Sequence, residues 1–114
     1  MCRWLILLVL FASACSKGPE ADLQYIKQAR SVAAEWALVN EQAAKGELTD
    51  RYVGSMHKWA RQQIETAAAG LTQPESAYGQ TMRTLLAQPD DAPPEELRAQ
   101  SDKLKSIEDS LESA

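Results

Sequence analysis

Residues 34–53 of the 114-residue chain read A-E-W-A-L-V-N-E-Q-A-A-K-G-E-L-T-D-R-Y-V, and this stretch decides the fold. Its first part continues an apolar pattern that starts near Tyr25 and recurs every three or four residues, which is typical of an amphipathic helix. Gly46 follows as a left-handed C-terminal cap, and Thr49 is suited to be the next N-cap. Only residues 46–48 link the two helices, so we expect an antiparallel helical hairpin.

The same signals predict four helices, over residues 20–45, 50–69, 74–88 and 92–112. Gly70 is expected to close the second helix, with Leu71 folding back as in a Schellman motif. The segment 72–75, T-Q-P-E, has capping-box spacing with a proline in the first turn, so the third helix is expected to begin there. The sequence therefore predicts an all-α fold with no strands, a single domain over residues 20–114. This small bundle of three to four helices is built on the hairpin, and packing of the fourth helix is left open.

Composition places the chain among ordinary globular proteins, with 45% hydrophobic and 25% charged residues. The net charge is −4, and it is unevenly distributed. Residues 89–114 hold eight acidic side chains and three basic ones. Such a segment repels phosphate groups, so nucleic acid is not an expected partner.

The N-terminal residues 3–15 read R-W-L-I-L-L-V-L-F-A-S-A-C and have the form of an export signal. The apolar run from Leu5 to Ala12 would extend about 12 Å as a helix, whereas a bilayer core is roughly 30 Å thick. It is therefore too short to span a membrane. The A-S-A at residues 12–14 suits ordinary signal peptidase, which would release a soluble secreted protein that begins at Cys15.

The same four residues, Ala12 to Cys15, resemble the lipobox of bacterial lipoproteins, although Ala12 stands where that family usually has leucine. The resemblance implies a signal peptide over residues 1–14, an acylated Cys15 and a linker up to residue 19, with membrane lipid as the partner. Ser16 is not the aspartate that retains lipoproteins on the inner membrane, which implies the periplasmic face of the outer membrane. Cys15 has no partner thiol once Cys2 is removed, and this favours lipidation over soluble secretion.

Three short motifs in the remaining chain are similar to a group of small uncharacterised bacterial helical proteins. They are A-E-W-A-L-V-N at residues 34–40, L-T-x-x-Y at residues 48–52 and P-D-D-A-P-P at residues 89–94. The resemblance implies a single domain and brings no activity or site residues.

His57, the only histidine, is the first candidate for chemistry. A metal site needs three or four ligands, and no second histidine is available. The helical neighbours of His57 include no carboxylate that could orient the ring, so we expect a surface or boundary histidine and no metal. Asn40 either hydrogen-bonds across the hairpin or faces solvent.

Basic and aromatic side chains on the second helix suggest two further sites. Arg51, Lys58 and Arg61, together with His57, form either a contact surface for lipid head groups or another anion, or a solvated face. Trp36, Tyr52 and Trp59 could line a pocket for an apolar small molecule. Alternatively, the two tryptophans are the large pieces of an alanine-rich core.

The sequence contains no phosphate-binding loop and no convincing nucleophile set, so we expect no enzyme activity and no cofactor. The leading hypothesis is a membrane-anchored envelope lipoprotein that acts as a non-catalytic adaptor and docks an envelope protein partner. The alternatives are a binder of a small apolar ligand and a soluble secreted helical protein.

Overall fold

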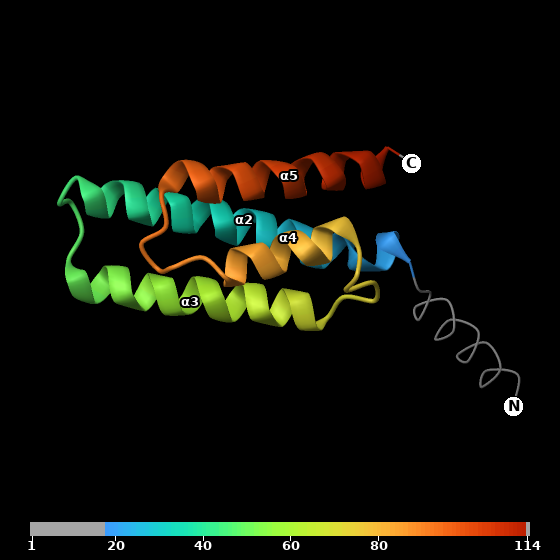
Figure 1. Ribbon diagram of the computed structural model, residues 1–114, viewed down its shortest axis with the longest axis horizontal. Coiled ribbons are helices and arrows are strands. Elements are labelled where there is room, and N and C mark those ends of the chain that lie inside the picture. Colours follow the sequence, from blue (N-terminus) through green and yellow to red (C-terminus); the bar gives the residue numbers. More distant parts are fainter. Residues whose placement is uncertain (1–17, 114) are drawn as a thin grey trace, which may run out of the picture.

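The computed structural model describes residues 18–113, in which the chain forms four helices and no strand. They are α2 (Pro19–Ala44), α3 (Asp50–Ala69), α4 (Ala77–Leu86) and α5 (Pro94–Glu112). Successive helices run in opposite directions, and the short α4 lies between α3 and α5 (Figure 1). The predicted all-α bundle is confirmed. In this part of the chain, no helix combines the length and the hydropathy needed to cross a membrane.

The α2–α3 hairpin forms as predicted from its caps. Gly46 has a φ of 73°, its N–H donates to the carbonyl of Ala43 at 3.0 Å, and the N–H of Glu47 donates to Gln42 at 3.1 Å. This pair of hydrogen bonds is a Schellman motif, and only glycine adopts the required φ without strain. The Thr49 hydroxyl then accepts a hydrogen bond from the N–H of Tyr52 at 3.2 Å and starts α3.

Helix α2 is the centre of the bundle because it packs against each of the other three helices, and its contact with α5 is more extensive than that with α3. Three ion pairs join α2 to α5: Lys27–Glu112 at 2.8 Å, Arg30–Glu108 at 2.6 Å and Glu41–Arg98 at 3.0 Å. The fourth predicted helix therefore packs on the first. Helices α3 and α5 do not pack on each other and lie at opposite edges of the bundle (Figure 1).

The core lies between α2 and the three helices around it. Its largest fully buried apolar side chains are Ile26, Trp36, Ile64, Met82, Leu85, Leu97 and Leu104. Alanines at positions 29, 33, 60 and 67 are also fully or almost fully buried. Such small side chains let neighbouring helix backbones approach closely, so each contact buries little area per residue.

The predicted start of the third helix at residue 74 is wrong. Helix α4 begins at Ala77, with the Ser76 hydroxyl accepting from the N–H of Gly79 at 3.3 Å. The N–H groups of Thr72 and Gln73 donate instead to the buried carboxylate of Asp22, and this tertiary contact holds residues 70–76 as a loop. Helix α4 also ends two residues earlier than predicted, at Leu86, and α5 begins at Pro94 rather than at residue 92.

The Schellman motif predicted at Gly70 is also wrong, because Gly70 has a φ of −83°. A Cβ at this position would lie 2.6 Å from the Tyr25 ring. A close approach to that ring, and not a left-handed conformation, therefore accounts for glycine at the end of α3.

Two helical glycines give a matched test of this packing. A Cβ on Gly79 would collide with the backbone carbonyl of Pro74, which cannot rotate away, whereas a Cβ on Gly54 meets nothing within 4 Å. We expect Gly79→Ala to lower the free energy of unfolding by about 1–3 kcal/mol. Gly54→Ala should raise it by about 0.5–1 kcal/mol, because alanine favours the helix. Urea denaturation of both variants measures the difference, and an equal gain in both would contradict the described packing.

Candidate functional site

The loop of residues 87–93, between α4 and α5, is fastened to the α2–α3 hairpin by Trp36, Asn40 and Arg61, which we call the loop latch. The indole Nε1–H of Trp36 donates to the carbonyl of Asp90 at 2.9 Å. The Asn40 amide Nδ2 donates to the same carbonyl at 3.0 Å and to that of Ala92 at 2.8 Å. These two hydrogen bonds from Asn40 join α2 to the loop and orient the amide.

Arg61 completes the loop latch from α3. Its Nε pairs with the Asp90 carboxylate at 2.6 Å, and its Nη1 donates to the carbonyl of Leu86 at 2.9 Å. Its Nη2 donates to the carbonyl of Gln88, and the guanidinium lies 5.2 Å from the centre of the Trp36 ring. A cation in this position satisfies carbonyls that the end of α4 leaves without helical partners. Arg61 is therefore committed to holding the loop, in contrast to the free anion-binding surface considered from the sequence.

The latch also determines which atom of the Asn40 amide faces His57. Both hydrogens of the Asn40 amide are directed at carbonyls, so its Oδ1 is the atom that lies 2.7 Å from His57 Nε2. A carboxamide oxygen only accepts, and the network therefore assigns a proton to Nε2 of His57. His57 is half-buried, as expected for a boundary residue, and among residues 18–113 no carboxylate or hydroxyl hydrogen-bonds to it. The hydrogen bond to Asn40 therefore orients the imidazole of His57.

A pocket of about 300 Å³ adjoins the latch at the hairpin end of the bundle. Its lining residues are Asn40, Ala43, Ala44, Val53, His57, Asp91, Ala92 and Pro94. None of the three aromatic residues proposed from the sequence to form a pocket is among them. This pocket is therefore not the site that the sequence predicted for an apolar ligand.

Trp36, Tyr52 and Trp59 are not brought together. Trp36 is 1% exposed and lies in the core, whereas Tyr52 is 49% exposed and Trp59 is 38% exposed. The prediction that Trp59 is a core residue is wrong. The buried side of α3 is centred on Ala60 and Ile64, and the neighbouring helices leave the line through Tyr52 and Trp59 uncovered.

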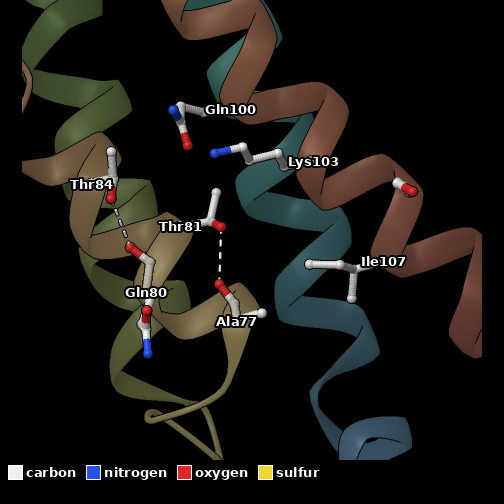
Figure 2. Close-up of a pocket in the computed structure, with 8 residues that line it drawn as sticks. Ala77, Gln80, Thr81, Thr84, Gln100, Lys103 and Ile107 are labelled. Carbon is white, nitrogen blue, oxygen red and sulfur yellow. Dashed lines mark hydrogen bonds between the residues drawn. The ribbon is translucent and has the colours of Figure 1, made fainter.

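A second depression, of about 430 Å³, lies between α4 and α5 (Figure 2). Gln80, Thr81 and Thr84 line it from α4, and Gln100, Lys103 and Ile107 face them from α5 (Figure 2). The hydroxyl of Thr81 donates to Ala77 at 2.9 Å, and that of Thr84 donates to Gln80 at 3.0 Å. Lys103 is the only charged residue of the lining. The groove therefore combines polar and apolar side chains around a single charged group.

Possible metal ligands gather at the end of α5, where carboxylates of Glu108, Asp109 and Glu112 lie within 4.8 Å of one another. Each has a basic partner. Glu108 pairs with Arg30, Asp109 pairs with Lys105 at 2.9 Å, and Glu112 pairs with Lys27. The cluster is therefore part of the ion-pair network between α2 and α5.

Asp22 is a buried titratable group that sequence reasoning missed. Its carboxylate is fully buried and accepts from Thr72 N–H at 2.7 Å, Gln73 N–H at 3.1 Å and the Tyr78 hydroxyl at 2.6 Å. Burial raises the pKa of Asp22, but these hydrogen bonds outweigh it, so the pKa lies below its ordinary value. Burial and the bond to Asp22 raise the pKa of Tyr78 to about 12. An aspartate in the first turn of a helix gave no sequence signal of this role.

Of the other candidate residues, Arg51 and Lys58 are exposed on α3, on the same helix as Tyr52 and Trp59. Cys15 lies outside the described residues. No protein-family model, no curated protein and no solved structure matches this chain.

Proposed function

We propose that the protein is a lipid-anchored envelope protein, tethered through Cys15 and acting as a non-catalytic adaptor that docks an envelope protein partner. The observation that carries the proposal is the short apolar run that ends in A-S-A-C at residues 12–15. Helix α2 begins at Pro19, four residues after Cys15. Four extended residues reach about 14 Å at most, so such an anchor would hold the bundle close to the lipid.

The described polar clusters support a structural role for the bundle. Asp22, Asn40 and Arg61 each hold a loop in place. The side chain that hydrogen-bonds to His57 within residues 18–113 is the Asn40 amide, which is itself part of the loop latch.

The anchor is tested by labelling bacteria that express the full chain with radioactive palmitate. We expect label in the wild-type protein and in Cys2→Ser, because Cys2 precedes the cleavage site, and none in Cys15→Ser. Label that survives Cys15→Ser would contradict the proposal. An unlabelled product that begins at Cys15 would instead support cleavage by ordinary signal peptidase and a soluble secreted protein.

The adaptor role needs a separate experiment, in which the labelled protein is crosslinked in intact envelopes and then captured under denaturing conditions. We expect a defined protein partner with wild type and much less of it with the unanchored Cys15→Ser chain. Capture without any enriched partner would count against the adaptor role while leaving the anchor intact.

A further inference from the structure

Three large hydrophobic side chains are exposed in residues 18–113, namely Leu38, Tyr52 and Trp59, and all three lie on the α2–α3 hairpin. Tyr52 and Trp59 are seven residues apart on α3, which places them on one line along the helix. Arg51 and Lys58 immediately precede them with the same spacing. We call the surface formed by Arg51, Tyr52, Lys58 and Trp59 the α3 edge.

The basic members of the α3 edge are not engaged by the rest of the bundle. Neither Arg51 nor Lys58 forms an ion pair with another of residues 18–113, whereas Arg61, on the side of α3 that faces α4, is held by the loop latch. Tryptophan and tyrosine favour the interface between water and lipid, where the ring is apolar and its polar atom remains wet. Lysine and arginine beside them can reach anionic head groups. This combination favours a lipid surface over a purely apolar partner.

The two outermost helices of the bundle, α3 and α5, differ in charge, and the difference favours contact of an anionic surface with α3. Helix α3 carries three basic and two acidic side chains, whereas α5 carries three basic and six acidic ones. The two helices occupy opposite edges of the bundle (Figure 1). An anionic surface would therefore attract the α3 side and repel the α5 side, which sets one orientation.

The α3 edge also lies on the helix whose end adjoins the start of the described chain. The Thr72 hydroxyl, just beyond α3, donates to the carbonyl of Gly18 at 3.3 Å. Trp59 lies ten residues before the last residue of α3, Ala69, or about 15 Å along the helix axis. A lipid anchor near residue 15 and the α3 edge can thus reach the same plane when α3 lies parallel to it.

We propose that the bundle docks flat on an anionic phospholipid surface through the α3 edge, with Tyr52 and Trp59 at the interface and Arg51 and Lys58 on the head groups. The docking rests on the proposed lipid anchor, which keeps the edge close to the membrane. One attachment point would leave the bundle free to rotate about its linker, and the α3 edge supplies the second contact.

The test uses the mature protein, which begins at the acylated Cys15 and so lacks Trp4, in vesicles of phosphatidylglycerol and phosphatidylethanolamine with brominated acyl chains, which quench nearby tryptophans. We expect strong quenching of Trp59 and none of Trp36, which is buried in the core. Comparison with Trp59→Phe isolates the contribution of Trp59. Quenching should fall sharply when phosphatidylcholine replaces the anionic lipid, because the electrostatic attraction is then lost.

Charge variants give the matched control. Arg51→Gln with Lys58→Gln should reduce the docking equilibrium constant about tenfold or more, since both basic contacts with the anionic surface are lost. Lys103→Gln with Lys105→Gln makes the same change in net charge on α5 and should leave quenching nearly unchanged.

Two results would overturn the docking proposal. Acylated protein with an unquenched Trp59 would keep the anchor but refute the α3 edge. Shielding of Trp59 only after envelope proteins are added would assign the edge to a protein partner. Failure of palmitate labelling, in contrast, would refute the anchor itself, so the two proposals fail in distinguishable ways.

Discussion

Trp36→Ala is expected to lower the free energy of unfolding by about 3–5 kcal/mol, because it leaves a large cavity and removes one attachment of the loop latch. Trp36 is 1% exposed, and its Nε1–H donates to the Asp90 carbonyl. A small domain of this size has on the order of 5 kcal/mol in total. The variant should therefore be close to unfolded at 25 °C, as measured by circular dichroism and urea denaturation.

Two further variants serve as comparisons. One separates the effect of the cavity from that of the lost hydrogen bond, and the other compares a buried tryptophan with an exposed one. Trp36→Phe keeps most of the buried ring but loses the donor to Asp90, so a loss of about 1–2 kcal/mol is expected. Trp59→Ala, at a side chain 38% exposed, should cost no more than about 2 kcal/mol. Equal losses for Trp36→Ala and Trp59→Ala would show that the two residues are buried alike, contrary to the structure.

Asp22→Asn is expected to destabilise the protein by about 2–4 kcal/mol at pH 7, the second large effect. An amide presents two donors where three donors already converge, from Thr72, Gln73 and Tyr78, so at least one buried donor is left unpaired. Urea denaturation at pH 7 gives the size of the loss. Glu20→Gln also removes an acidic charge from the first turn of α2, but at an exposed position, and should change stability by less than about 0.5 kcal/mol.

The pH dependence of this effect follows from the direction of the pKa shifts. Because the pKa of Asp22 is lower in the folded state, its contribution is full above the unfolded-state pKa of about 4 and is lost as pH falls below it. The difference between wild type and Asp22→Asn should therefore shrink in acid. Tyr78 makes stability depend on pH in the alkaline range. Its folded-state pKa of about 12 exceeds the ordinary 10, so stability should decline from pH 10 to pH 12. A difference that stays constant from pH 7 to pH 3 would contradict the assigned role of Asp22.

The helices and the hairpin could be predicted because their signals are local. Gly46 and Thr49 decide the turn through backbone conformation and a side-chain cap, and both act within four residues. The start of the third helix, in contrast, was predicted wrongly because a contact with a distant residue sets residues 72–76. A capping-box pattern was present at Thr72, but Asp22, fifty residues away, takes the backbone donors that set the loop.

The candidate site was less predictable for the same reason. Basic charge on α3 was evident in the sequence, but Arg61 and Lys58 have different roles because α4 and its following loop cover only one of them. Periodicity gave α3 an apolar side that included Trp59. Periodicity could not show how much of that side α2 and α4 would cover. The extent of this cover decides that Trp36 is a core residue and that Trp59 is exposed.

The sequence by itself determined an all-helical chain, the turn at Gly46 and the candidate lipid attachment at Cys15, because each rests on neighbouring residues. Only the tertiary structure decided that α2 is central, that Asp22 and Arg61 hold loops, and that the aromatic and basic side chains of the α3 edge are left uncovered. Those outcomes depend on contacts between residues 25 to 80 positions apart in the chain, whose geometry exists only once the helices have packed.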